Sequence, residues 1–216
     1  MQAVRMAILS QRTFELDGRS YPYFVSNGNR TWDNERAVEL PVGREAVQAH
    51  GRSETIIEVG NVLGQHFADV QHRVLDKFEH HPCVTWNEDV LEFRPPFVPE
   101  LVVSISTLEH VGHSERPPWP EKFRLAVEAV IGWLAPGGRL IFTVPLGYNP
   151  SVLEFLDDPV PEVVSMRFMR RTTLDNLWEQ TSFSEVRDYR YDRPFRCANA
   201  IAIVEARAAY PSPTPD

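Results

Sequence analysis

A carboxylate and two glycines follow a short run of branched apolar residues in the first third of the chain. The stretch ETIIEVGNVLG places Glu58, Gly60 and Gly64 at and after the end of a segment typical of a buried strand. Glycines at such a turn let the backbone approach a ligand closely, and a carboxylate can accept hydrogen bonds from it. The pattern therefore predicts a ligand site at the end of this strand.

Two familiar phosphate-binding patterns do not fit the turn. A dinucleotide loop of the form G-x-G-x-x-G would need glycines at the positions of Val62 and Gln65. A P-loop would need a Gly-Lys-Ser/Thr ending, and none follows. What remains is acid-x-Gly-x-x-x-Gly, with Asn61 directly after the first glycine.

Further side chains suited to ligand binding follow the next apolar runs. Asp76 lies near the end of HRVLDKF, Asp89 and Val90 follow CVTW, Ser106 ends LVVSIS, and His110 comes four residues later. A carboxylate can accept hydrogen bonds from both hydroxyls of a diol. A histidine can move a proton near neutral pH. These residues predict a polar site with one candidate proton acceptor.

The elements that would position these residues alternate between strands and helices. Strands are expected at 55–59, 72–78, 83–86, 101–106, 139–144, 184–191 and 198–206, and helices at 117–138 and 172–181. No helix is expected between the last two strands, so they should form an antiparallel pair. The alternation predicts an α/β, doubly wound, mostly parallel sheet.

In order and spacing, these segments resemble the class I S-adenosylmethionine-dependent methyltransferases. The glycine turn resembles motif I of that family, STLEHVG its fourth-strand motif, and LAPGGRLIFTVP its fifth strand. The resemblance covers residues 54–206. It implies a seven-stranded sheet of order 3-2-1-4-5-7-6 with the last strand antiparallel. It also implies S-adenosyl-L-methionine as the cofactor and S-adenosyl-L-homocysteine as the product.

The resemblance assigns roles to individual residues. Those expected to bind the cofactor are Glu58, Gly60, Asn61, Gly64, Asp76, Asp89, Val90 and Ser106. Asp76 is expected at the ribose hydroxyls, and Glu79 is an alternative for that role. Asp89 and Val90 are expected at the adenine. His110 is the candidate general base, unless it only shapes the cofactor pocket.

Two regions lie outside the alternation and are expected to cover the acceptor. Residues 1–53 form an N-terminal cap, with a helical pair broken at Pro41, ahead of the domain at 54–209. Residues 145–171 form a long insertion after the fifth strand. The tail at 210–216 is expected to be disordered. Candidate acceptor-binding residues in these regions are Trp32, Tyr148 and Asn149.

Composition limits the partners. Lys and Arg total 22 against 30 for Asp and Glu, a net charge of −8, which opposes nucleic-acid binding. Cys83 and Cys197 lack the spacing of a disulfide framework or metal site, so reduced thiols in the cytoplasm are expected. His113 completes an H-x-x-H with His110, but no third ligand is evident and no metal is expected. No apolar run reaches the ~20 residues of a membrane span. The oligomeric state stays open.

The sequence thus predicts an enzyme that transfers a methyl group to an oxygen or nitrogen of a small-molecule acceptor by in-line displacement. A degenerate methyltransferase fold acting as a binding or scaffold subunit is the alternative, because Val62 stands where the family usually has its middle glycine. A nicotinamide-dependent oxidoreductase is disfavoured by the glycine spacing.

Overall fold

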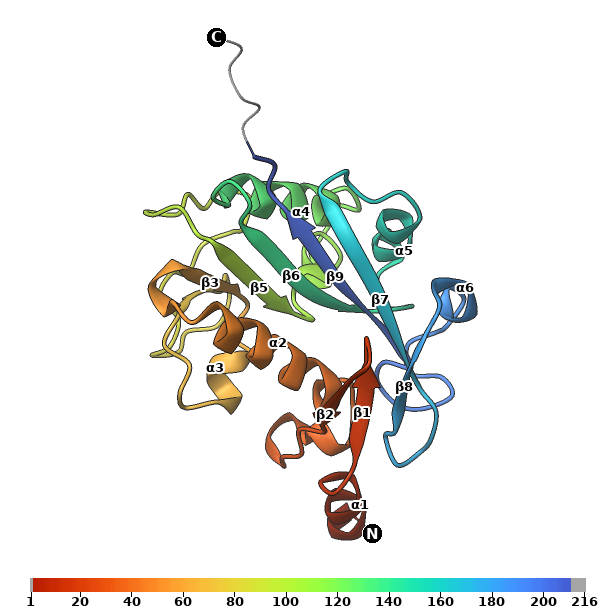
Figure 1. The fold of residues 1–216 in the computed structure, drawn as a ribbon. Coiled ribbons are helices and arrows are strands. Elements are labelled where there is room, and N and C mark those ends of the chain that lie inside the picture. Colours follow the sequence, from red (N-terminus) through yellow and green to blue (C-terminus); the bar gives the residue numbers. More distant parts are fainter. Residues whose placement is uncertain (1, 211–216) are drawn as a thin grey trace.

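The computed structural model describes residues 2–210 and shows a sheet between two layers of helices (Figure 1). In spatial order its strands are β4 (Arg73–Leu75), β3 (Ile56–Val59), β5 (Leu101–Ile105), β6 (Arg139–Pro145), β9 (Ala200–Arg207), β7 (Val163–Arg171) and β8 (Trp178–Thr181). The first four are parallel neighbours, and β9 runs antiparallel between β6 and β7. In this order β4, β3, β5, β6 and β9 are the expected strands 2, 1, 4, 5 and 7, and β7 occupies the place expected for strand 6. The predicted α/β, mostly parallel sheet is confirmed.

The two edges of the sheet differ from the prediction. The third strand, expected at 83–86, contributes a single parallel bridge between Leu75 and Trp86. At the other edge, the segment predicted as a helix at 172–181 supplies β8, which pairs with β7. The prediction of a strand at 184–191 is wrong as well, because the short helix α6 (Phe183–Val186) occupies the start of that segment. Seven strands therefore result from a different set of segments.

Local turn chemistry explains these two errors. Asn176 has a φ of 63°, which interrupts a helix, and the Thr172 amide donates to the Leu177 carbonyl at 2.8 Å to close the turn between β7 and β8. Helix α6 begins with a capping box in which the Ser182 and Glu185 side chains satisfy each other's backbone amides. That S-x-x-E signal was present in the sequence.

The segment at 145–171, expected to be an insertion that covers the acceptor, belongs largely to the sheet domain. Its second half is β7, which pairs with β9 over most of its length. Its first half contains α5 (Pro150–Asp157), whose apolar residues Val152, Phe155 and Leu156 are buried against the sheet. Only the short loop between β6 and α5 remains at the carboxyl edge of the sheet.

Helices cover both faces of the sheet because strand residues alternate between them. Val102, Leu140 and Phe142 face α4 (Lys122–Trp133) and α5. Val103 and Ile141 face the opposite side and pack in one cluster with residues of α2 (Arg36–His50). The remaining short helices are η2 (Ser53–Thr55), α3 (Leu63–His66) and η3 (Leu108–His110).

Residues 2–35 are the first part of the cap expected at 1–53 and are called the cap below; they pack against the β7–β8–β9 side of the sheet. They contain α1 (Gln2–Leu9), β1 (Thr13–Leu16), β2 (Arg19–Pro22) and η1 (Gly28–Asp33). Cap residues share one buried cluster with Met169, Trp178 and Ile201 of the sheet. Trp32 belongs to that cluster, and the guanidinium groups of Arg5 and Arg30 lie 5.0 and 5.2 Å from its ring. The cap is therefore part of the core.

Helix α2 is continuous, so the predicted break at Pro41 is wrong. Proline lacks the amide that would donate to the carbonyl of Ala37. That carbonyl accepts instead from the Phe24 amide of the cap, at 2.9 Å. The cap thus supplies the hydrogen bond that proline removes.

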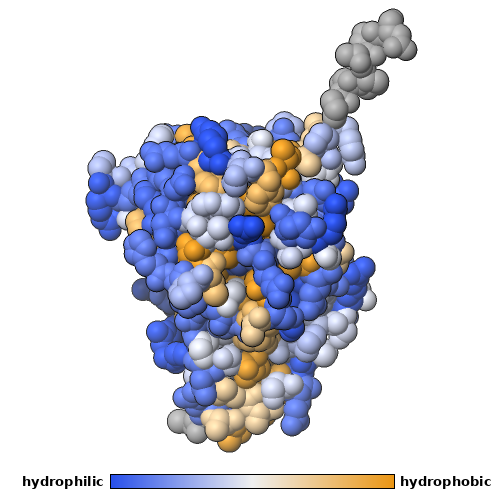
Figure 2. Space-filling model, turned by 90° about the vertical axis from the view of Figure 1, so that its left-hand side faces the viewer, coloured by the Kyte–Doolittle hydropathy of each residue, from blue (hydrophilic) through white to orange (hydrophobic). Residues whose placement is uncertain are grey.

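Hydrophobic residues reach the surface at the lower end of the molecule, where α1 exposes Val4 and Ile8 (Figure 2). Both cysteines are free thiols, as expected. Within residues 2–210 no helix combines the length and apolarity needed to cross a membrane. Most of the expected disordered tail, residues 211–216, lies outside the described residues.

Candidate active site

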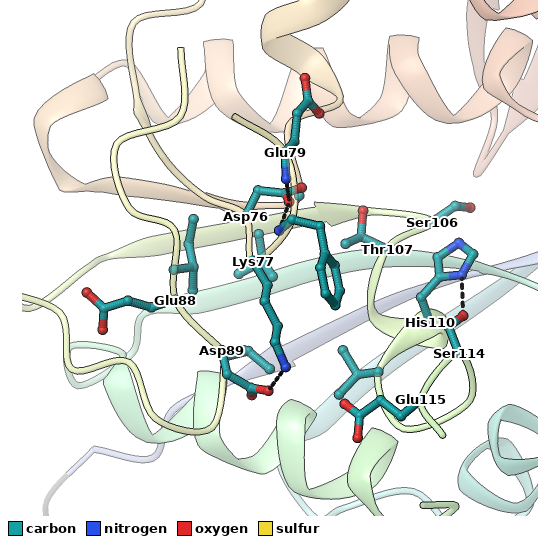
Figure 3. A pocket seen from close by; sticks show the side chains of 16 residues that line it. Asp76, Lys77, Glu79, Glu88, Asp89, Ser106, Thr107, His110, Ser114 and Glu115 are labelled. Carbon is teal, nitrogen blue, oxygen red and sulfur yellow. Dashed lines mark hydrogen bonds and ion pairs between the residues drawn. The ribbon is translucent and has the colours of Figure 1, made fainter. Parts of the chain in front are cut away.

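A cavity of about 480 Å³ opens at the carboxyl ends of β3, β4 and β5 (Figure 3). Open α/β sheets bind ligands at this edge, and pockets for small molecules usually measure about 300–1,000 Å³. The expected site residues that line it are Gly60, Asp76, Asp89, Val90, Ser106 and His110. Glu58, Asn61 and Gly64 do not line it.

Gly60 occupies the one position of the first turn that requires glycine. Its φ is 88°, and a Cβ at this position would overlap the Thr107 side chain. Its amide donates to the Leu75 carbonyl at 2.8 Å, which fixes the end of β3 against β4. The backbone at Gly60 therefore forms the floor of the cavity beside Thr107.

Glu58 is placed differently from the expectation, because its carboxylate is used within the fold. It is fully buried, and Oε1 accepts from the amides of Val62 and Leu63 at 2.8 and 2.6 Å. Oε2 lies 2.7 Å from His72 Nε2. Both oxygens are occupied, so Glu58 shapes the glycine turn from behind and does not reach the cavity.

Asn61 and Gly64 support the same turn. The Asn61 side chain donates to Glu79 Oε1 at 2.9 Å, and the Asn61 backbone amide donates to Asp76 Oδ2 at 3.3 Å. Gly64 lies within α3, where a Cβ would stand 3.0 Å from Asn61 Oδ1. Asn61 therefore connects the first turn to the acids that follow β4, and Gly64 leaves room for the Asn61 side chain.

Asp76 and Glu79 both line the cavity, as the two alternatives for a diol ligand require. Asp76 Oδ1 accepts from the amides of Phe78 and Glu79 at 2.9 and 2.8 Å, whereas Oδ2 has only the 3.3 Å contact with Asn61. Glu79 is held by Asn61 and by Gln65, whose Nε2 lies 2.8 Å from Oε2. Asp76 therefore retains the freer oxygen.

Asp89 lies in the cavity wall but is already paired. Its Oδ2 accepts from Lys77 Nζ at 2.8 Å, as Figure 3 shows. The same oxygen accepts from Lys122 Nζ at 2.7 Å, and Oδ1 accepts from the Leu91 amide. Burial raises the pKa of Asp89, but these lysines outweigh it and lower the pKa to about 2. The carboxylate is held ionised, with Val90 beside it as an apolar wall.

His110 stands at the opposite end of the cavity. Its Nδ1 lies 3.1 Å from Tyr148 Oη and 3.3 Å from Ser114 Oγ, and its side chain is half exposed. Burial, the Arg36 guanidinium and His113 lower the pKa of His110, which favours the neutral imidazole. A neutral ring can accept a proton, as the candidate base must.

The expected acceptor residues are not brought together. Tyr148 approaches the cavity through His110, with ring centroids 5.0 Å apart. Asn149 is buried, accepts from the Ser151 amide as the N-cap of α5 and donates to the Glu109 carbonyl. Trp32, in η1 of the cap, is buried in the cluster that the cap shares with the sheet. Of the three, only Tyr148 is positioned near the cavity.

Several lining residues were not anticipated, namely Lys77, Phe78, Glu88, Thr107, Val111, Ser114 and Glu115. Most adjoin an anticipated residue in the chain, so adjacency was the available signal. Lys122 was hidden because it begins α4, far along the chain, yet it bridges Asp89 and Glu115. Among residues 2–210, no group of three or more side chains is arranged to hold a metal ion.

A mostly parallel sheet of this order, with a cavity at the carboxyl ends of β3, β4 and β5, is the arrangement expected of a class I methyltransferase. No protein-family model and no curated protein matches the chain.

Solved structures do resemble the chain. The N-methyltransferase NodS from Bradyrhizobium japonicum WM9, in complex with S-adenosyl-L-homocysteine, is 15% identical with a TM-score of 0.46, covering 85% of this chain and 94% of that one. An rRNA methylase from Streptococcus thermophilus is 11% identical with a TM-score of 0.47, covering 79% and 96%. An amino pentose methyltransferase from Micromonospora echinaspora with bound S-adenosylmethionine is 18% identical with a TM-score of 0.38, covering 50% and 49%. Similarities this low do not identify the methyl acceptor of the chain.

Proposed function

We propose that the chain is an S-adenosyl-L-methionine-dependent methyltransferase that acts on an oxygen or nitrogen of a small-molecule acceptor. The observation that supports this most directly is the cavity itself, which joins the Gly60 turn, Asp76 and His110 at the carboxyl edge of the sheet. The net charge of −8 favours a small acceptor over a nucleic acid. Two free thiols fit the cytoplasm.

The residues present fit such a cofactor. Asp76 Oδ2 can accept from a ribose hydroxyl, with Glu79 as its rival, and Val90 with Leu75 offers apolar contact to an adenine. Acidic residues outnumber the single lysine in the lining, which favours a cationic ligand: Asp76, Glu79, Glu88, Asp89 and Glu115 against Lys77. When bound, the cofactor supplies an electrophilic methyl group on a sulfonium.

Binding measurements test the proposal. Calorimetry should detect S-adenosyl-L-methionine and S-adenosyl-L-homocysteine but not NAD. In Asp76→Asn, the amide oxygen still accepts from the turn amides while the charge is lost, so affinity for S-adenosyl-L-homocysteine should fall roughly ten- to a hundredfold, or about 1.5–3 kcal/mol. Glu79→Gln should change it less. A loss in Glu79→Gln with normal binding by Asp76→Asn would move the ribose contact to Glu79, and no binding to the unaltered protein would refute the proposal.

One observation favours the alternative of a degenerate, non-catalytic subunit. The carboxylates of Glu58 and Asp89, both expected to bind the cofactor, are occupied by partners within the chain. Protein that binds S-adenosyl-L-homocysteine but never transfers a methyl group would support that alternative. Binding of NAD alone would instead support an oxidoreductase.

A further inference from the structure

Three buried carboxylates gather beside the His110 end of the cavity. Glu35, Glu39 and Glu109 are 7%, 0% and 2% exposed, and Arg36 is the cation among them. These four residues are called the acidic cluster. Glu35 and Arg36 come from the start of α2 and Glu109 from η3, so the cluster forms only when the first helix of the sheet domain meets the end of β5.

The cluster contacts the cavity wall. Arg36 donates to the carbonyls of Ile105 and Ser106 at 3.0 and 3.3 Å, and Glu39 Oε1 accepts from the Ser106 hydroxyl. Ser106 lines the cavity. Glu109 lies between Leu108 and His110 in η3, and its Oε1 is 3.8 Å from His110 Nε2. Glu109 therefore does not line the cavity itself but lies next to His110, which does.

Hydrogen bonds leave Glu109 unsatisfied. Glu39 is paired with Arg36 at 2.9 Å, and Glu35 Oε2 accepts from the Ala198 amide at 3.1 Å. Glu109 Oε2 is buried with no hydrogen-bond partner. Burial, with repulsion from Glu39 and Glu35, raises the pKa of Glu109 well above its usual value although Arg36 opposes this. A buried carboxylate in this state requires a proton or a cation.

Aromatic rings gather around His110, the neighbour of Glu109 in η3. The Tyr148 ring lies among the rings of His110, His113 and Tyr191, with centroids 5.0, 5.0 and 5.2 Å away. Glu35 raises the pKa of Tyr191 after burial itself, so the tyrosine is close to the acidic cluster and stays a neutral ring. Aromatic faces beside a buried carboxylate are a combination that binds organic ammonium ions.

We infer that the methyl acceptor is an amine, bound as its ammonium ion by the Glu109 carboxylate near the Tyr148 ring. This inference rests on the proposed methyltransferase function and names its substrate class. The ammonium ion reaches Glu109 when the His110 ring, held by the hydroxyls of Tyr148 and Ser114, turns aside.

An ammonium ion has no lone pair and must first lose a proton. One N–H bond breaks, its proton moves to a Glu109 oxygen, and the electron pair remains on nitrogen. The products are a neutral amine, which carries the lone pair that methyl transfer requires, and a neutral carboxylic acid. The raised pKa of Glu109 suits this exchange, since a more basic carboxylate accepts a proton more readily.

Calorimetry with simple probes tests the inference with and without S-adenosyl-L-homocysteine. Primary amines from methylamine to benzylamine are each compared with the alcohol of the same skeleton. At least one amine should bind tenfold or more tightly than its alcohol, and Glu109→Gln should abolish that preference. The matched control Glu92→Gln changes an exposed carboxylate outside the cavity and should keep it.

Thermal melting supplies a second readout. If Glu109 is kept for a ligand, Glu109→Gln should melt at the same temperature as the unaltered protein or higher, because the substitution removes a buried carboxyl oxygen that has no hydrogen-bond partner. A marked fall would indicate a structural carboxylate and overturn the inference. So would amines and alcohols that bind alike or not at all, or a preference that survives Glu109→Gln. S-adenosyl-L-homocysteine binding by the same variant is the separate test of the proposed function.

Discussion

At the level of single residues, the carboxylates near the cavity differ in how much of each is free to meet a ligand. Glu58 and Asp89 have their oxygens occupied by amides, a histidine or lysines within the fold. Asp76 keeps one oxygen with only a long contact, and Glu109 keeps one with none. The free oxygens are where ligand binding is expected.

Gly60 should be the least replaceable residue of the turn. Gly60→Ala forces a left-handed backbone on alanine and pushes a methyl group into Thr107, so we expect a loss of about 2–4 kcal/mol in unfolding free energy. Gly132→Ala is the matched control, since its Cβ in α4 meets nothing within 4 Å and should stabilise by about 0.5–1 kcal/mol. Urea denaturation of both variants measures this, and equal effects would contradict it.

Asp89 should give the protein a pH-dependent contribution to stability. Its pKa in the folded state is about 2, below the unfolded value of about 3.9, so ionised Asp89 stabilises the fold above pH 4 and this contribution is lost as pH falls toward 2. Asp89→Asn should therefore be less stable at pH 7 by roughly 2 kcal/mol, because about 1.4 kcal/mol per pKa unit is reduced by solvent screening at this partly exposed site. Urea denaturation at a series of pH values should show this difference in unfolding free energy becoming smaller as the pH falls. A difference that stays constant with pH would assign the effect to packing.

At the level of elements, Tyr23 connects the cap to the edge of the sheet by hydrogen bonds. Tyr23 Oη accepts from the Trp178 amide at 2.7 Å and lies 3.3 Å from the Trp178 carbonyl, all buried at the start of β8. Tyr23→Phe leaves that amide without a partner and should cost about 1–3 kcal/mol in unfolding free energy. Tyr21→Phe is the control, because its hydroxyl meets the partly exposed Glu45. A larger loss in the control would contradict this anchoring role.

For the whole molecule, the cap and the sheet should unfold together. The cap contributes Leu9, Phe14, Leu16, Tyr23 and Trp32 to the buried cluster that covers β7, β8 and β9. Deleting residues 1–35 would expose this face of the sheet to water, so we expect the truncated chain to lose its cooperative thermal transition and its near-ultraviolet circular dichroism. A truncated chain that melts as sharply as the full one would show instead that the cap is a separable cover.

The sequence by itself determined the central strands and part of the site. The apolar runs of β3, β5, β6 and β9 are buried on both faces, so composition alone identified them. Gly60 and Asp76 were predictable because a positive φ and a turn after a strand leave local signatures. His110 was found through its motif, although its role as a base stays a prediction.

Tertiary structure decided which strands form the edges and which acids are free. β8 pairs because β7 is available beside it, which outweighs a weak helical pattern. Glu58 is hydrogen-bonded to a histidine fourteen residues away, and Glu39 accepts a hydrogen bond from a serine sixty-seven residues away. The free energy of burying a polar group depends on the partner that folding brings to it, and no local pattern of residue types records that partner.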